Sequence, residues 1–154
     1  FAEIGNGTVG IGVSYVPGSI SSPQNINTQV QGTNGSSTDE SVQADFEELT
    51  TVYAIARLPK WGLYLKAGIS SVDIDITETN TSAVYPDSST DGFTAGFGIE
   101  RDIGMLAVRA EIMGHEFDDV NATNGSAAGA ADANVIDVTE MIGATATISL
   151  VKNF

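Results

Sequence analysis

The chain has 154 residues, no cysteine, and 6 basic against 20 acidic residues, which gives a net charge of −14. Phosphate binding needs clustered cations, so this charge argues against a nucleic-acid partner, and the missing cysteines exclude disulfides and thiolate sites. No window of 18 apolar residues is present, so no transmembrane helix is predicted. The 17 glycines and the lack of sustained apolar residues at helical spacing favour an all-β chain forming a single domain, residues 1–154.

The first expected strand covers about residues 3–16 and contains Gly5-Asn6-Gly7-Thr8-Val9-Gly10, which fits G-x-G-x-x-G. That motif binds a dinucleotide only between a strand and a helix. Here large and small residues alternate from Val9 to Tyr15, and Pro17-Gly18 and a polar stretch follow. The segment is therefore predicted to be a strand without a cofactor site.

Alternation predicts six long strands in all. Their approximate ranges are 3–16, 46–58, 62–76, 92–101, 105–117 and 135–154. Long polar connections at 17–45, 77–91 and 118–134 alternate with tight turns at 59–61 and 102–104. Short connections at one end and long ones at the other are typical of an antiparallel up-and-down transmembrane β-barrel.

The two faces of these strands differ in composition. One face carries an apolar residue at almost every position, with Ala among larger residues, and the other is rich in Gly and Thr with few charges. This distribution fits a barrel with lipid outside and small or polar residues in a narrow interior. Gly10 and Gly12 would then leave room for larger inward side chains, such as Tyr53, Tyr64 or Arg109. A soluble barrel that carries an apolar ligand inside is an alternative.

The third strand changes its pattern after Ser70-Ser71, where the apolar residues move to the opposite parity at Val72, Ile74 and Ile76. A β-bulge would have this effect. A strand that has already left the membrane would also have it, since about 9–11 residues suffice to cross. The favoured interpretation is a strand that projects above the bilayer, with or without a bulge.

The chain end ISLVKNF, with Phe154 at its terminus, adds a further pattern to the strands and connections. Together these features resemble the small outer-membrane β-barrel proteins of Gram-negative bacteria, the OmpA-like and opacity-type group. In that family a C-terminal aromatic residue is the signal that the barrel-assembly machinery reads. Ile148 and Leu150 match its alternating apolar positions, whereas Lys152 stands where an aromatic or aliphatic residue is more usual.

The resemblance covers essentially the whole chain and implies a fold and a location, the outer membrane, with outer-membrane lipid and lipopolysaccharide as surroundings. Members of the family usually have eight strands, and six are visible here. Three explanations stay open: a six-stranded barrel, further strands upstream, or a hairpin within residues 17–45.

Five charged residues are expected to form a layer in the interior. Arg57, Lys66, Glu100, Arg109 and Glu111 all fall on the inward face, within about seven residues of a tight turn. A charge in a narrow lumen has to be paired, because its burial alone is costly. The layer is interpreted as a structural plug, with a gate or ion path as the alternative.

The single histidine, His115, raises the question of a hydrolytic triad. No nucleophile motif surrounds any serine, and neighbouring residues of one strand point to opposite faces. The chain is therefore predicted not to be an enzyme, although lipid-modifying barrel enzymes exist.

Acidic residues are concentrated near the ends of the strands that face the long connections. Asp73, Asp75, Asp118 and Asp119 belong to this rim, and none has the spacing of a calcium loop. The hypothesis is that the rim recruits Ca²⁺ or Mg²⁺ weakly and shares it with lipid, and no other cofactor is expected. The predicted role is structural, adhesive or in surface recognition, with a narrow channel as the alternative; self-association stays open.

Overall fold

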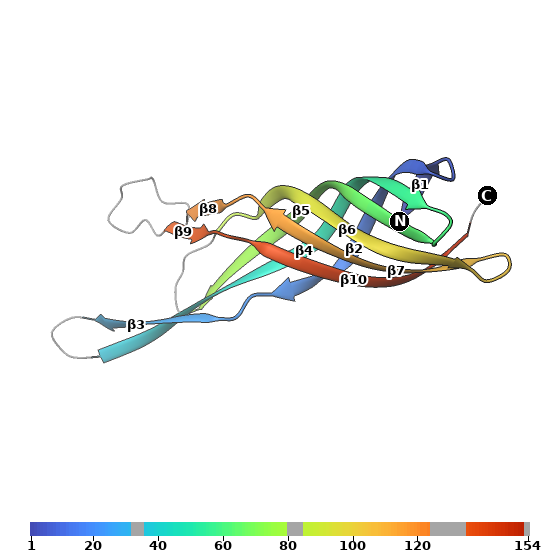
Figure 1. Ribbon diagram of the computed structural model, residues 1–154. Coiled ribbons are helices and arrows are strands. Elements are labelled where there is room, and N and C mark those ends of the chain that lie inside the picture. Colours follow the sequence, from blue (N-terminus) through green and yellow to red (C-terminus); the bar gives the residue numbers. More distant parts are fainter. Residues whose placement is uncertain (32–35, 80–84, 124–134, 153–154) are drawn as a thin grey trace.

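The computed structural model of the chain describes residues 1–31, 36–79, 85–123 and 135–152. The described part is all-β and antiparallel (Figure 1), which confirms the predicted class. Its strands are β1 (Ala2–Gly5), β2 (Val9–Ser21), β3 (Asn25–Gln31), β4 (Ser36–Leu58), β5 (Leu63–Thr79), β6 (Ser88–Asp102), β7 (Ala107–Phe117), β8 (Val120–Thr123), β9 (Val135–Val138) and β10 (Ile142–Val151).

The main sheet is curved and has the strand order β1-β2-β4-β5-β6-β7-β10, with β3 paired to the first part of β4. Strands β8 and β9 form a separate two-stranded sheet. The turns 59–62 and 103–106 lie at one end of the molecule, and β3, β8 and β9 lie at the other (Figure 1). These are the turn end and the far end below. None of the described residues belongs to a helix long and apolar enough to cross a membrane.

The prediction of one first strand over residues 3–16 is wrong, because the chain reverses at Asn6. Strand β1 pairs back onto β2, with Gly5 opposite Gly10. The Asn6 side chain accepts hydrogen bonds from the backbone amides of Thr8 and Val9, both at 2.9 Å, and the Asn6 amide donates to the Val9 carbonyl at 2.9 Å. The first two glycines of the G-x-G-x-x-G stretch therefore flank the asparagine of a hairpin turn.

The count of six strands is wrong in two further places. Residues 17–45 were expected as a loop but supply the end of β2, all of β3 and the start of β4. This range therefore contains a hairpin, although β3 lies off the main strand order. The expected strand 135–154 is split, because β9 pairs with β8 whereas β10 pairs with β7. Residues 80–84, 124–134 and the expected assembly signal Phe154 lie outside the described residues.

Strand β5 keeps its inward and outward alternation along its whole length. It pairs with β6 without a break from Leu63 to Ile74. The nearest irregularity lies on β4, where the register shifts between Glu47 and Thr50 and Glu48 has a φ of 55°. The change of parity at Ser70-Ser71 therefore reflects no bulge in β5.

Candidate functional site

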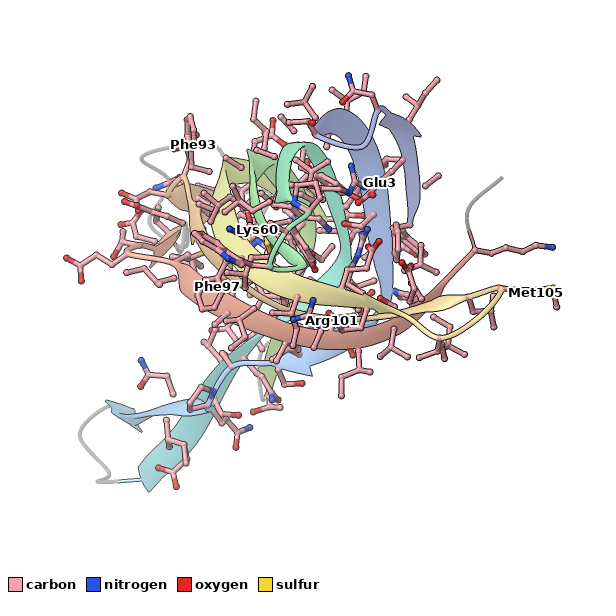
Figure 2. The ribbon with its side chains drawn as sticks, turned by 45° about the vertical axis from the view of Figure 1, so that its right-hand side comes forward. Glu3, Lys60, Phe93, Phe97, Arg101 and Met105 are labelled. Atoms are coloured by element: carbon pink, nitrogen blue, oxygen red, sulfur yellow. The ribbon has the colours of Figure 1, made fainter. Side chains whose placement is uncertain are left out.

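The outward face of the sheet toward the turn end carries exposed apolar side chains, which we call the apolar band. On β6 the band includes Phe93, 74% exposed, which points away from the sheet in Figure 2. Its large members on all strands are Val9, Ile11, Val13, Tyr15, Val52, Leu58, Leu63, Leu65, Ile69, Phe93, Phe97, Ile99, Ile112, Ile142, Ile148 and Leu150. Soluble proteins rarely expose a contiguous apolar surface on this scale.

Charged or polar residues end the band on the same outward face. On β6 the exposed Asp91 lies beyond Phe93 toward the far end, and the exposed Arg101 lies beyond Ile99 toward the turn end. On β5 the outward positions after Ile69 are Ser71 and Asp73. On β6 the band is thus bounded by a charged residue at each end, and on β5 it ends at Ser71 and Asp73 toward the far end.

Behind the band, the structure brings the five predicted inward charges together and adds Glu3 of β1 as a sixth. Arg109 donates to Glu3 through Nη1 at 2.7 Å and through Nη2 at 3.0 Å. It also donates to Glu100 Oε2 through Nε at 2.9 Å and through Nη2 at 2.5 Å. Glu3 in turn accepts from Arg57 Nη2 at 2.5 Å.

A second centre of the charged layer lies at Lys66. Its Nζ atom is 2.6 Å from Glu111 Oε2, which also accepts a hydrogen bond from the Tyr64 hydroxyl at 2.8 Å. Lys66 Nζ lies 4.0 Å from the centre of the Tyr53 ring, and the Tyr53 hydroxyl donates to Glu3 at 2.8 Å. The two centres are therefore linked through Tyr53 and Glu3.

The charged layer is buried at its two centres, Arg109 and Lys66, and its charges balance. The Arg109 and Lys66 side chains are only 2% and 3% exposed. Three cations face three carboxylates: Arg57, Lys66 and Arg109 against Glu3, Glu100 and Glu111. Pairing of this kind offsets the free-energy cost of removing the charges from water, whereas loss of one partner leaves an uncompensated charge.

Glycines provide the space for the largest side chains of this layer. A Cβ atom at Gly12 would lie 2.7 Å from the Tyr53 ring, which confirms the predicted reason for that glycine. A Cβ atom at Gly98 would collide with the Tyr64 hydroxyl. Tyr64 is directly opposite Gly98, and Lys66 is directly opposite Gly96. Large inward residues therefore sit beside residues that have no side chain.

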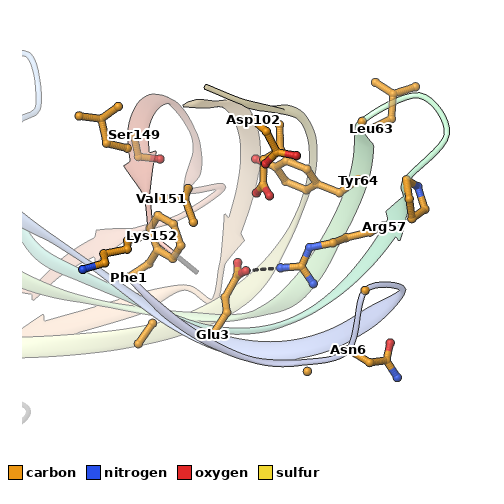
Figure 3. A pocket seen from close by; sticks show the side chains of 17 residues that line it. Phe1, Glu3, Asn6, Arg57, Leu63, Tyr64, Asp102, Ser149, Val151 and Lys152 are labelled. Carbon is orange, nitrogen blue, oxygen red and sulfur yellow. Dashed lines mark hydrogen bonds and ion pairs between the residues drawn. The ribbon is translucent and has the colours of Figure 1, made fainter. Parts of the chain in front are cut away.

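Cavities lie on both sides of the charged layer. One of about 930 Å³, at the turn end, is lined by Arg57, Tyr64 and Glu100 among others, and Figure 3 shows the Glu3–Arg57 ion pair at its wall. Another of about 240 Å³ is lined by Tyr53, Lys66 and Glu111 among others. The layer of paired charges therefore stands between the two spaces.

Toward the far end the interior changes from polar to apolar. Val72, Ile74 and Ile76 of β5 point inward and are buried with residues from other elements. The buried members of this upper core are Ala44, Val72, Ile74, Ile76, Tyr85, Ala122 and Met141. Above the band the sheet thus has an ordinary apolar core, and its outward side carries acids such as Asp73 and Asp75.

His115 lies inside, between the charged layer and the upper core. Its Nδ1 atom is 3.1 Å from Ser70 Oγ, and its Nε2 atom is 3.1 Å from Thr145 Oγ1. Ser70 is fully buried and is also 2.8 Å from Thr51 Oγ1. A serine without access to solvent is poorly placed to attack a substrate, so this network reads as a hydrogen-bonded interior layer.

The four predicted rim acids do not converge on one point. Asp73 and Asp75 lie on the outward face of β5, whereas Asp118 and Asp119 follow β7. The Asp119 carboxylate accepts a hydrogen bond from the Glu140 amide at 3.1 Å. Within the part of the chain that the structure describes, no group of three or more His, Cys, Asp or Glu residues could hold a metal ion.

Comparison of the chain with family models, curated proteins and solved structures found no match. The interpretation of this site therefore rests on its own geometry.

Proposed function

We propose that the chain is a membrane-spanning β-barrel protein of the Gram-negative outer-membrane type, with a plugged interior and a surface role carried by its far end. One observation carries this proposal. Below the level of Ile69 and Phe93 the sheet is inverted, with buried ion pairs inside and exposed apolar side chains outside.

The inversion has a simple physical reason if lipid meets the outer face. Apolar side chains then gain by contact with acyl chains, and polar side chains satisfy one another in the interior. In water the same arrangement would expose the band while holding six charges in the interior, two of them, Lys66 and Arg109, buried. The reversal within β5, where acids face outward and Ile74 and Ile76 face inward, supports a strand that leaves the bilayer above Ile69.

Closure of the sheet is part of the proposal. An open edge does not occur in the hydrocarbon region, because its backbone groups would lack hydrogen-bond partners. Among the described residues the sheet ends at β1 and β10. The reach of Glu3 on β1 to Arg109 on β7, the neighbour of β10, supports a sheet that curls toward closure.

The far end is the part best placed for a structural, adhesive or recognition role at the cell surface. Strands β3, β8 and β9 lie there, at the end opposite the tight turns (Figure 1). The outward acids Asp45, Glu47, Asp73 and Asp75 make this region anionic. Lipopolysaccharide is also anionic, so weak bridging by Ca²⁺ or Mg²⁺ shared with lipid remains part of the proposal.

An open channel is disfavoured by two features of the interior. The charged layer stands between the two cavities, and the upper core fills the interior toward the far end. We therefore expect purified protein in planar bilayers to give no steady ion conductance. Steady conductance would favour the alternative of a narrow channel.

Extraction and flotation test the proposal directly. The protein, expressed with an export signal in a Gram-negative host, should stay with membranes in high salt and urea and need detergent for release. It should also float with lipid vesicles after refolding. A soluble barrel that carries an apolar ligand would remain in the aqueous fraction in both experiments.

A further inference from the structure

Strands β1 and β10 stand at the two ends of the main sheet, and they run in the same direction. Along the order β1-β2-β4-β5-β6-β7-β10, every neighbouring pair of described strands is antiparallel. The first and the last strand of this order therefore both run from the far end to the turn end. Direct pairing of β1 with β10 would be parallel, in a sheet whose other pairs are all antiparallel.

One further strand between β1 and β10 would remove this mismatch. Such a strand would run from the turn end to the far end, so it would be antiparallel to both neighbours. Antiparallel pairing is slightly more stable per residue than parallel pairing. The free edge of a strand also presents a row of unpaired N–H and C=O groups, which is a template for another strand. The two edges thus specify the direction of the neighbour that they lack. We call the space between them the seam.

A cavity lies at the turn end of the seam. It is the space of about 930 Å³ described above, and its lining includes Ala2, Glu3 and Gly5 of β1 together with residues 149–151 of β10. Asn6, in the turn that follows β1, also lines it, and Figure 3 shows residues of both edges around this cavity. The seam is therefore open at the end where a strand of the required direction would begin.

The residues beside the seam indicate the chemistry of its occupant. On the outward face Ile4 of β1 is 74% exposed, and Ile148 and Leu150 of β10 are 82% and 67% exposed. On the inward face stand Glu3, which belongs to the charged layer, and Ser149. Side chains of a strand alternate between its two faces. A strand in the seam would therefore match its neighbours with apolar side chains outside and polar side chains inside.

We propose that the seam binds the extended C-terminal tail of a partner polypeptide, in which apolar and polar side chains alternate. A strand that runs from the turn end to the far end has its N-terminal side at the turn end. A partner whose folded part lies at the turn end would therefore enter the seam with its C-terminal tail. The inference rests on the proposed membrane insertion, because an open sheet edge does not occur in hydrocarbon. It adds to that function the kind of partner and its direction.

A second copy of the chain is the weaker candidate for this position. Two copies in one bilayer have the same orientation, so β1 and β10 of the second copy also run from the far end to the turn end. They could pair with the edges of the seam only in parallel.

The test uses a synthetic peptide with the sequence of Val9–Val16 and a lysine tag at its N-terminal end. This segment of β2 pairs antiparallel with β1 and alternates apolar residues with Gly or Ser, so it imitates the proposed tail. A cysteine is placed near one end of the peptide or the other, and disulfides form under mild oxidation in vesicles. A cysteine near the N-terminal end should link to L150C, and one near the C-terminal end should link to A144C, which lies farther from the turn end.

A matched cysteine on β6 separates binding at the seam from simple dissolution of the peptide in lipid. Ile148 and Ile99 are outward residues at the same height, because both are direct neighbours of Ala110 on β7. A peptide with its cysteine in the middle should link to I148C about tenfold more than to I99C, because main-chain hydrogen bonds hold an added strand at the edge. A shuffled peptide that lacks the alternation should show no such preference.

Double variants show whether the two edges instead pair with each other. Directly paired strands lie about 4.8 Å apart, whereas strands with another between them lie about twice that distance apart. Cysteines whose Cα atoms are more than about 7 Å apart do not form a disulfide. The variants I4C/A146C, I4C/I148C and I4C/L150C should therefore form none, either within one chain or between two copies.

Three results would overturn the inference: equal linking of the peptide to I148C and I99C, a reversed preference of its two ends, or a disulfide between β1 and β10. Flotation of the same samples with the vesicles reports separately on membrane insertion. If the protein floats and any of these results appears, the proposed function stands without this partner. A protein that does not float would overturn both proposals.

Discussion

Arg109 on β7 and Glu3 on β1, which are 106 positions apart in the chain, are joined by two hydrogen bonds of 2.7 and 3.0 Å. The guanidinium also holds Glu100 on β6, so one buried cation connects three strands of the curved sheet. The charged layer therefore holds the sheet in its curved shape and also fills its interior.

Replacing Arg109 by Met should destabilise the folded protein by about 3–5 kcal/mol, because it leaves carboxylates in the interior without their cation. Glu100 is the better partner for a double-mutant cycle with Arg109, because a change at Glu3 would also remove its contacts with Arg57 and Lys66. The double variant R109M/E100M should recover part of the loss in urea unfolding in vesicles. Additive losses would argue against coupling between the two residues.

Gly98 should not tolerate a side chain, because the Tyr64 hydroxyl occupies the space that a Cβ atom would take. We expect G98V to destabilise the protein by at least about 1–3 kcal/mol, the usual cost of overpacking. The control G143V lies at an inward position of β10 where nothing is within 4 Å of a new Cβ atom, so its unfolding midpoint should stay near the parent's. The second change in G98V/Y64G should recover only part of the loss, because the Ala110 carbonyl oxygen would still lie 2.5 Å from the new Cβ atom. If stability does not rise, contact with Tyr64 is not the reason for glycine at position 98.

The positions of Tyr53, Lys66 and Arg109 on the inward face follow from the period of two in the sequence, as does the exposure of the apolar band. The role of Glu3 does not follow from it, because a single strand over residues 3–16 leaves Glu3 beyond the reach of β7. The Asn6-Gly7 pair was the available signal for a hairpin there. The upper core joins Ala44, Tyr85 and Met141 from distant segments, and such contacts leave no periodic pattern in the sequence.

The carboxylates above the band should respond to salt. Asp45 is directly opposite Asp75, and Glu47 is directly opposite Asp73, on β4 and β5. Like charges in such pairs are destabilising. We expect the thermal midpoint to rise with salt and with millimolar Ca²⁺ and to fall with chelator in vesicles that contain lipopolysaccharide.

The variant D73N/D75N removes one partner of each pair and should blunt that response. It is a cleaner choice than a change at Asp119, whose carboxylate binds the Glu140 amide. If the variant responds to Ca²⁺ and chelator as strongly as the parent, the acids form only a solvated surface.

Arginine on the band should be costly in lipid. Ala95 lies at the middle of the band on β6, and A95R should lower stability by about 2–4 kcal/mol, as arginine does at the bilayer midplane. A146R on β10 should act similarly, since Ala146 is also outward and exposed. The control S89R places arginine on the same face of β6 beyond Asp91, and it should have little effect.

The contact between the band and lipid can be measured most directly by spin labels along β6. The chain has no cysteine, so single cysteines can be introduced at outward positions 89, 93, 95, 97, 99 and 101 without removing any other thiol. In vesicles, nitroxides at 93, 95, 97 and 99 should collide with oxygen dissolved in lipid and be protected from a water-soluble nickel reagent. Labels at positions 89 and 101 should be accessible to the nickel reagent and should collide less often with oxygen. Free access of the nickel reagent to positions 95 and 97 in protein bound to vesicles would contradict the membrane-spanning account.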